Sequence, residues 1–476
     1  MTNPTTTLPA SATTHLLHAT LQDRITGSLI GSALGDAIGL YTEFMTAATA
    51  ATAYPTGKFT LGGSGNHAAH TPPTPFKLDA HRAPKLPGDW TDDTDHALLV
   101  LLAFLHTART GGTRAPGGGA PGGADGRELH PPPPMPTQQA LAARLRVWVS
   151  QGFRPLDTMP LGLGRLVGTV VASAGFDADP ERVAREYWEK TGRRVAPNGS
   201  LMRTHPLGLV CLFREEEEAF EVAAALSRVT HFDPRCVLAC VAGTGLVRAL
   251  ARGEVVVEGD VDAVVKRGLE WFQGTGDGGE LDIEELWKHV GPESGLEKLN
   301  LDEQAAIGYV YKTLGSGVVL LRMAIRRLAA SKNGLLDRTF LFEQLITDLI
   351  MRGGDADTNA CFAGALLGAY LGYYALPDHW KHGLKYQEWL LEKSVALCQV
   401  LGVGDGDYDG AEHKDTDPLA GKPAISQDEM EGRWMVLQQA TFRKMEDAAK
   451  GSSSKASGSS WSFLFKKEKG SGGTAR

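Results

Sequence analysis

The amino-acid sequence predicts an all-α fold, a compact multi-helix domain interrupted by loop insertions. Apolar runs such as residues 97–105 have the composition of buried helix segments. Glycines recur every four positions in two separate segments, a spacing that places them on one face of a helix. No series of segments alternates between apolar and polar residues, as the strands of a sheet would. Together these features predict helices without a sheet.

Residues 15–44 form the first predicted helix and carry one of the two glycine stripes. Its members are Gly27, Gly31, Gly35 and Gly39. Each glycine inside a helix costs about 1 kcal/mol relative to alanine, so close approach to another helix must compensate. Because Asp23 and Asp36 interrupt the segment, the core of a soluble protein is favoured over a membrane dimer.

A second glycine stripe further along the chain is the predicted partner of the first. Its members are Gly364, Gly368 and Gly372. Two helices with such smooth faces could cross closely and bring their ends into one site. This pairing is a hypothesis that the tertiary structure can test.

The chain is expected to divide into a central domain, insertions within it and two flexible ends. Residues 45–87, low in aliphatic side chains, predict a long loop. The charged insertion should contain short helices over residues 261–272 and 283–290. The predicted segments are a flexible N-terminus (1–14), a main domain (15–403) with a low-complexity insertion (111–136) and a charged insertion (254–300), a connection and C-terminal helix (404–450), and a disordered tail (451–476).

Composition argues against several classes of protein. With 476 residues and a net charge of −8, the chain is not expected to bind nucleic acid stably. Its five cysteines include no CxxC pair, which argues against a disulfide framework or a zinc knuckle. Without a signal peptide or a run of transmembrane length, we expect a cytoplasmic protein, with the nucleus as an alternative location. An aromatic–basic patch at residues 461–467 could contact a membrane surface or a partner, although such tails are usually only solvated.

Two helix starts are unusually acidic. The first, residues 88–96, carries four carboxylates directly before an apolar run; these are Asp89, Asp92, Asp93 and Asp95. One aspartate at a helix start is ordinary capping, but four crowded carboxylates repel one another and favour a bound cation. The second start, residues 353–358, aims Asp355 and Asp357 from one turn. Brought together, the two clusters would form an all-oxygen cage suited to Mg²⁺, Mn²⁺ or Ca²⁺ rather than Zn²⁺. The alternative is two well-capped surface helices.

These two motifs, Thr91-Asp92-Asp93-Thr94 and Gly353-Gly354-Asp355-Ala356-Asp357-Thr358, resemble the paired metal motifs of the ADP-ribosylglycohydrolase family. The resemblance spans about residues 23–401 and implies two divalent cations, Mg²⁺ or Mn²⁺. The implied metal ligands are Thr91, Asp92, Asp93, Asp355, Asp357 and Thr358. Ala356 departs from the threonine often found there, but its side chain is not an expected ligand. Glu43 matches an acidic residue near the family's site; whether Asp92, Asp93 or Glu43 is the catalytic acid or base is left open.

Three further segments resemble parts of the family's ADP-ribose cleft. The stretch after Pro197 implies substrate-binding roles for Asn198, Gly199, Ser200, Met202 and Arg203. Thr230-His231 and Gly308-Tyr309-Val310 add His231 and Tyr309 as implied ligand contacts. From the residues alone, these segments could equally be a capped helix start, a structural histidine and a core tyrosine.

The resemblance implies a metal-dependent hydrolase that cleaves the glycosidic bond between ADP-ribose and a modified protein side chain. Its expected partner is an ADP-ribosylated protein or another ADP-ribose-containing substrate. Two alternatives remain: a catalytically inactive relative that binds ADP-ribose or has a structural role, and a hydrolase of an ADP-ribosylated small molecule.

Overall fold

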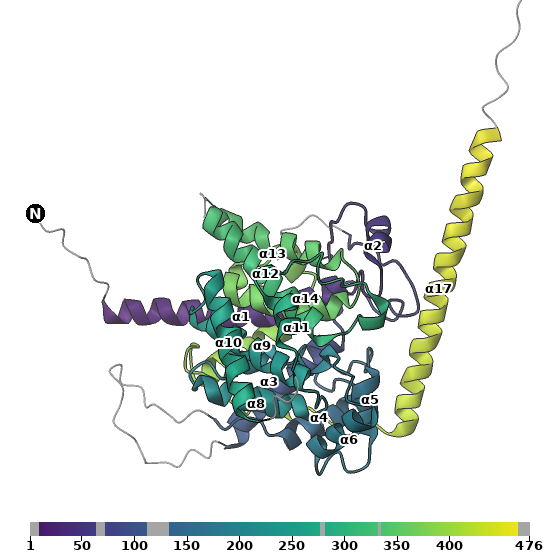
Figure 1. Ribbon diagram of the computed structural model, residues 1–476. Coiled ribbons are helices and arrows are strands. Elements are labelled where there is room, and N and C mark those ends of the chain that lie inside the picture. The colour runs from purple at the N-terminus through teal and green to yellow at the C-terminus, as the bar shows by residue number, and fades with distance from the viewer. Residues whose placement is uncertain (1–8, 63–71, 112–132, 277–280, 332–334, 465–476) are drawn as a thin grey trace, which may run out of the picture. The chain divides into compact units, whose positions relative to one another are not determined.

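The computed structural model describes residues 9–62, 72–111, 133–276, 281–331 and 335–464, with the backbone alone for 10, 111, 335–337 and 451–464. These residues form helices and connecting loops, and within them no strand occurs (Figure 1). Only isolated bridges are found, such as those joining Thr46 to Gly353 and Pro197 to Tyr309. The all-α prediction is confirmed.

The described chain forms two compact units, residues 1–74 with 87–424 and residues 75–86 with 425–476. The larger unit contains every element before the last helix. These elements are α1 (Ala10–Gly39), α2 (Ala47–Ala53), α3 (Asp92–Gly111), α4 (Gln138–Gln151), α5 (Arg165–Ala172), α6 (Pro180–Lys190), η1 (Asn198–Ser200), α7 (His205–Val210), α8 (Glu216–Arg228), α9 (Pro234–Arg252), α10 (Glu258–Gly274), α11 (Ile283–Val290), η2 (Gln304–Ala306), α12 (Val310–Ala330), α13 (Leu335–Ile350), α14 (Ala356–Leu371), η3 (Tyr373–Ala375), α15 (Asp378–Lys381), α16 (Gln387–Val400) and η4 (Lys414–Thr416).

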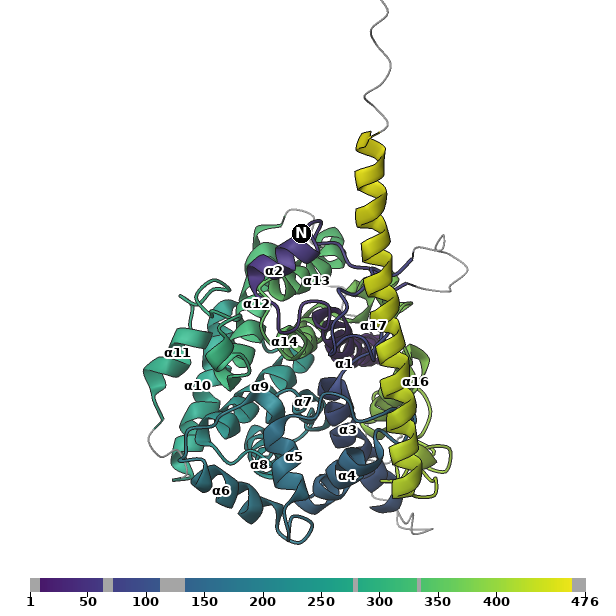
Figure 2. The same ribbon diagram turned by 90° about the vertical axis from the view of Figure 1, so that its right-hand side faces the viewer.

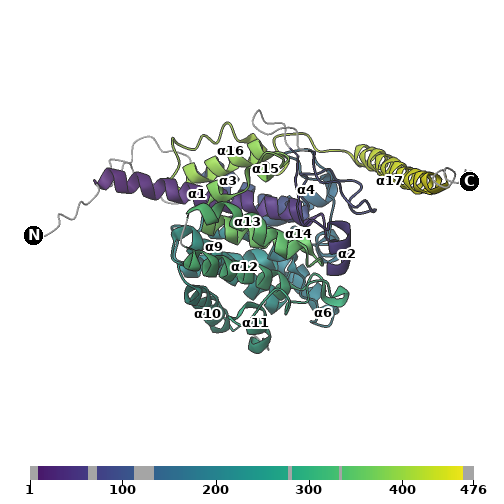
Figure 3. The ribbon, with the colours of Figure 1, turned by 90° about the horizontal axis from the view of Figure 1, so that it is seen from above.

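From Leu21 on, helix α1 is buried within the larger unit, with α14 alongside it (Figures 2 and 3). A Cβ added at Gly35 would lie 1.9 Å from the carbonyl oxygen of Ala360. One added at Gly364 would lie 2.1 Å from the carbonyl oxygen of Gly31. The two backbones therefore touch directly, and the predicted pairing of the glycine stripes is confirmed.

The register of this pair is antiparallel. A Cβ at Gly27 would approach the Gly368 carbonyl at 2.3 Å, and one at Gly39 would approach the Ala356 carbonyl at 2.4 Å. The C-terminal end of α1 consequently meets the first turn of α14. This contact brings the chain after Gly39 next to the second acidic motif.

Helix α9 lies in the core of the larger unit. Its length and composition would allow it to cross a membrane, and 89% of its apolar stretch is buried inside the fold. That burial matches the core helix of a globular domain, in which such a helix packs against other helices on all sides.

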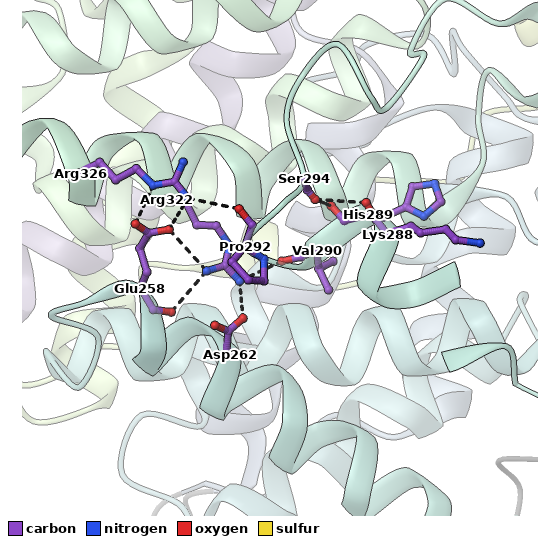
Figure 4. A network of polar contacts seen from close by, with 9 residues as sticks. All are labelled: Glu258, Asp262, Lys288, His289, Val290, Pro292, Ser294, Arg322 and Arg326. Carbon is purple, nitrogen blue, oxygen red and sulfur yellow. Dashed lines mark hydrogen bonds and ion pairs between the residues drawn. The ribbon is translucent and has the colours of Figure 1, made fainter. Parts of the chain in front are cut away.

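The charged insertion contains two helices, as predicted. Helix α10 covers residues 261–272 and α11 covers residues 283–290. Both are fastened to α12 by a polar network around the buried Arg322 (Figure 4). Arg322 is paired with the carboxylate of Asp262 and donates to the main-chain oxygen of Val290 at 2.9 Å. The insertion is thereby held against α12, whose N-cap residue is the predicted ligand residue Tyr309.

Two less regular segments contain more helix than the sequence analysis expected. The expected loop over residues 45–87 contains helix α2, whose N-cap Thr46 accepts a hydrogen bond from the Thr49 amide at 3.1 Å. The last helix, α17 (Gln427–Leu464), continues past residue 451, where the tail was expected to begin. The aromatic–basic patch has no described side chains, and most of the low-complexity insertion also lies outside the described residues.

The smaller unit consists of α17 and a short segment from the first part of the chain. Lys444 on α17 donates to the main-chain oxygens of Ala83 and Lys85 at 3.1 and 2.8 Å. Arg82 in the same segment is buried and pairs with Asp79. None of the residues predicted for the site belongs to this unit.

Candidate active site

Asp36 of α1 fixes the start of α3, which carries the first acidic motif. Its carboxylate accepts hydrogen bonds from the Thr91 amide at 2.9 Å, the Thr94 amide at 3.0 Å and the Thr94 hydroxyl at 2.6 Å. The side chain of Asp36 is fully buried. Asp36 therefore caps α3 from another helix, using the unpaired amides that every helix start presents.

The two glycines of the second motif make the turn that leads into α14. Gly353 and Gly354 have φ angles of +67° and +76°, which favour glycine. Side chains would also clash there, because a Cβ at Gly354 would lie 2.0 Å from the Leu301 carbonyl oxygen. The Gly354 amide donates to the Met45 oxygen at 2.8 Å, and the Phe44 amide donates to the Gly354 oxygen at 2.6 Å. These bonds tie the motif to the segment that follows α1.

Glu43 joins the second motif as a consequence of this backbone pairing. Carboxylate oxygens of Glu43, Asp355 and Asp357 all lie within 4.8 Å of one another. Asp357 is also hydrogen-bonded to Glu43. Two buried carboxyl groups in such contact share a proton when no cation is present, because both cannot ionise without strong repulsion. The structure thus brings Glu43 together with two of the predicted metal ligands.

The first and second motifs meet through Asp93 and Asp357. Burial raises the pKa of the Asp93 carboxyl well above its usual range, and the charge of Asp357 raises it further. Burial likewise raises the pKa of Asp357, with a second contribution from Glu43. Smaller contributions to Asp93 come from the other carboxylates of the cluster, namely Asp36, Asp92 and Asp355. The two acidic motifs, far apart in sequence, form one cluster of negative charge.

This cluster fits a divalent cation. One carboxylate oxygen of Asp93, Oδ1, is buried and has no hydrogen-bond donor among the described residues. The other, Oδ2, accepts the Thr91 hydroxyl at 3.0 Å. An unsatisfied buried carboxylate oxygen is costly unless a cation or a proton compensates it. A hard cation with oxygen ligands meets that requirement, and all the donors here are oxygens.

The other two aspartates of the first motif have structural partners. Asp95 accepts the indole N–H groups of Trp90 and Trp148 at 2.8 and 2.9 Å. Asp89 forms an ion pair with Lys385 at 2.7 Å. Asp89 and Asp95 are therefore engaged within the fold, whereas Asp93 interacts with the charge of Asp357. Asp92 Oδ1 lies against Gly162, where an added Cβ would come within 2.1 Å of it.

The turn at Asn198 is joined to the second motif on its other side. The Asn198 amide donates to the Gly308 oxygen at 3.0 Å, and the Val310 amide donates to the Ala196 oxygen at 3.1 Å. The Asn198 side chain then donates to Asp355 Oδ2 at 2.7 Å. Asn198 thus orients a predicted metal ligand, whereas the sequence analysis expected it to contact the substrate.

Three residues of this stretch have side chains behind the turn. Ser200, Met202 and Arg203 have exposed fractions of 0%, 4% and 1%. Their side chains are buried behind the turn, as is that of His231. That they line a ligand cleft stays a prediction. Gly199 is different, because a Cβ there would lie 3.1 Å from the Nε2 and Cε1 atoms of His231. The His231 ring edge therefore faces the turn.

Tyr309 forms the opposite side of the turn and is partly exposed. The guanidinium group of Arg235 lies 5.8 Å from its ring centre, and the His289 ring lies 5.8 Å away. Arg235 also lines a cavity of about 590 Å³. Three more arginines, Arg193, Arg194 and Arg228, line the same cavity. Three carboxylates, Asp233, Asp282 and Glu285, also line this cavity, and Arg235 is ion-paired with Asp233. The four arginines leave a small excess of positive charge beside Tyr309.

The ADP-ribosylglycohydrolase family model matches residues 17–408. The chain belongs to the ADP-ribosylglycohydrolase family. An uncharacterized protein of Archaeoglobus fulgidus is 22% identical over 391 residues, which cover 80% of this chain and 97% of the relative. A solved structure described as an ADP-ribosylglycohydrolase-related protein complex has 22% identity and a TM-score of 0.48, covering 80% of this chain and 99% of its own. The resemblance found in the sequence is confirmed, and the protein is a hydrolase of the ADP-ribosylglycohydrolase type.

The sequence analysis of this ADP-ribosylglycohydrolase missed two parts of the site. It treated Asp36 only as an argument against a membrane helix. It also overlooked Thr313, whose hydroxyl accepts from the Asn198 side-chain Nδ2 at 2.9 Å and donates to Asn359 Oδ1 at 2.7 Å. An aspartate inside a glycine-striped apolar helix is itself a signal, because a buried carboxylate requires donors. No comparable signal singles out Thr313.

Proposed function

We propose that the protein hydrolyses the glycosidic bond between ADP-ribose and a modified protein side chain, and that it requires two divalent cations, Mg²⁺ or Mn²⁺. The observation that carries this proposal is the meeting of two acidic helix starts with Glu43 beside the Asn198 turn. Family membership supplies the general reaction. The protein substrate and the cations are our inference.

The proposed metal ligands are the residues of the two motifs, Thr91, Asp92, Asp93, Asp355, Asp357 and Thr358. Their geometry supports this assignment: Thr358 donates to Asp355 Oδ1 at 3.4 Å, and Thr91 is bound to Asp93. When bound, the cations supply positive charge that can orient hydroxyl oxygens of the ribose and lower the pKa of a water molecule.

The reaction exchanges one bond at the anomeric carbon of the distal ribose. The bond from this carbon to the side-chain nitrogen or oxygen breaks, and a bond to a water oxygen forms. One proton must leave the water and one must reach the departing side chain. Asp92 and Glu43 are the proposed groups for these transfers, since Asp93 has one oxygen bound to Thr91 and the other fully buried. Asp92 is the more accessible of the two, being only half-buried.

The ADP-ribose portion is proposed to bind across the Asn198 turn. Gly199 and His231 would contact it on one side and Tyr309 on the other. The arginines in the neighbouring cavity support this orientation, because a pyrophosphate carries negative charge and guanidinium groups bind phosphate oxygens in pairs. An aromatic ring such as that of Tyr309 can also stack on a base or a ribose.

The test uses peptides carrying ADP-ribose on arginine or on serine, with Mg²⁺ or with a chelator. We expect release of free ADP-ribose from at least one peptide only when Mg²⁺ is present. The double variant Asp92→Ala with Asp355→Ala should show no release. Undiminished release by this variant would show that the residue assignment is wrong.

The same assay separates the alternatives. If neither peptide is hydrolysed but ADP-ribose binds tightly, the protein is an ADP-ribose-binding relative without this activity. If only an ADP-ribosylated small molecule is hydrolysed, the proposal of a protein substrate fails while the hydrolase assignment stands.

A further inference from the structure

A buried chain of hydrogen bonds runs from Arg203 through Thr230 to His231, directly behind the Asn198 turn. Arg203 Nη2 donates to Thr230 Oγ1 at 2.8 Å, and Thr230 Oγ1 lies 2.7 Å from His231 Nδ1. All three side chains are about 1% exposed. A second bond, from Arg203 Nη2 to the Leu226 oxygen at 3.0 Å, fixes the guanidinium group in place.

The chemistry of the three groups determines the direction of the proton between Thr230 and His231. A guanidinium group only donates, so Thr230 Oγ1 must accept from Arg203. The Thr230 hydroxyl still has its own proton, and among the described residues His231 Nδ1 is its one acceptor. His231 Nδ1 therefore accepts. In a neutral imidazole the proton must then be on Nε2.

We propose that Arg203 and Thr230 are positioning residues, which hold His231 as the neutral tautomer protonated on Nε2 so that it donates a hydrogen bond to a ribose or phosphate oxygen of ADP-ribose. The tautomer stands on the geometry alone, whereas the identity of the acceptor rests on the proposed function. In this role Arg203 acts on His231 through Thr230 and does not need to contact the substrate itself.

The surroundings of His231 support this assignment on three counts. Its Nε2 edge faces Gly199, where an added Cβ would lie only 3.1 Å away. Burial lowers the pKa of His231 well below its usual value, and the charge of Arg203 lowers it further, so the ring is neutral near pH 7. Burial lowers the pKa of Arg203 only to about 10, so that group remains a charged donor at the same pH.

A carboxylate, the more usual partner of a histidine, is engaged elsewhere. Asp233, two positions along the chain, accepts two bonds from the Arg235 guanidinium at 2.9 Å each and one from the Trp188 indole at 2.9 Å. A carboxylate on Nδ1 would accept a proton and force the opposite tautomer. The Thr230 hydroxyl therefore leaves the proton of His231 on Nε2, the ring nitrogen proposed to face the ligand.

The first test reads the tautomer directly in the full-length protein. Histidine is labelled with ¹⁵N, and the His231 signals are assigned by their loss in His231→Gln. We expect an unprotonated Nδ1 and a protonated Nε2 in the wild type. Thr230→Ser keeps the hydroxyl and should give the same pattern, whereas the isosteric Thr230→Val should lose it. A protonated Nδ1 in the wild type, or an unchanged pattern in Thr230→Val, would overturn the proposal.

The second test measures ADP-ribose binding by calorimetry. Thr230→Val should weaken binding about 10-fold, the effect of one misplaced hydrogen bond, and Thr230→Ser should restore it to within about 2-fold. Equal affinity of all three proteins would overturn the role in binding. A wild type with the expected tautomer but no affinity for ADP-ribose would instead overturn the proposed function, while the tautomer result would still support the positioning by Arg203 and Thr230.

Discussion

At the scale of single residues, Asp93 and Asp95 show how neighbouring carboxylates can serve different ends. They lie in the same turn of α3, and both are buried. Asp93 has an oxygen without a donor among the described residues, whereas Asp95 accepts two indole N–H groups. The first is suited to a cation, and the second is already satisfied within the fold.

Substitution by asparagine should separate these two roles. Asp95→Asn places an amide N–H against an indole N–H and should lower the free energy of unfolding by about 1.5–3 kcal/mol, with the Mg²⁺-induced rise in melting temperature retained. Asp93→Asn removes a negative charge that neighbouring carboxylates repel, so the free energy of unfolding should stay the same or increase. In this variant Mg²⁺ should no longer raise the melting temperature. Thermal denaturation with and without Mg²⁺ measures both effects. A full Mg²⁺ response in Asp93→Asn would contradict the metal assignment.

The raised pKa values of Asp93 and Asp357 predict a pH-dependent response to Mg²⁺. A carboxyl with a raised pKa in the folded state stabilises the metal-free fold while it is protonated, and this stabilisation is lost as pH rises through the folded-state pKa. Cations bind only the ionised form. The stabilisation by Mg²⁺ should therefore be small at about pH 5 and increase toward about pH 8. A shift in melting temperature that is constant over this range would count against cation binding by these carboxylates.

At the scale of helices, α1 organises the site. Asp36 on α1 holds the start of α3, and Gly39 meets Ala356 at the start of α14. Glu43 follows directly after the same helix. One rigid element thus determines the positions of both acidic motifs and adds a carboxylate of its own.

The close contact of α1 with α14 can be tested with one methyl group. In Gly35→Ala the Cβ would lie 1.9 Å from the Ala360 oxygen, so the two backbones must separate. We expect the free energy of unfolding to fall by about 3 kcal/mol, which is the upper part of the usual range for overpacking. Mg²⁺ binding should also weaken. The matched control is Gly259→Ala on α10, where no atom lies within 4 Å of the added Cβ. Chemical denaturation measures both variants, and equal stability of the two would contradict close packing.

At the scale of the whole molecule, all residues proposed for the site belong to the larger unit. Removing residues 425–476 deletes α17, which belongs to the smaller unit. We expect this truncated protein to keep the Mg²⁺-induced rise in melting temperature and ADP-ribose release within about 2-fold, because no proposed ligand is lost. Loss of the Mg²⁺ response in a folded truncated protein would show that the smaller unit contributes to the site.

Much of the site could be predicted because its parts have local sequence signals. Acidic helix starts, a Gly-Gly turn and a four-residue glycine spacing are all readable within a few positions. Burial is not local, and for this reason the depth of the Ser200, Met202 and Arg203 side chains behind the turn could not be predicted. Helix α2 was missed because the prediction relied on apolar periodicity, which this short alanine–threonine segment lacks even though alanine itself favours a helix.

The sequence by itself determined the helical class, the family and the two acidic motifs, since each depends on residue type and short-range spacing. Only the tertiary structure decided that Asp36 caps α3, that Asn198 orients Asp355, and that Arg203 acts on His231 through Thr230. The physical reason is that hydrogen bonds and charge interactions depend on distances in space, which close packing of α1 against α14 sets for residues hundreds of positions apart.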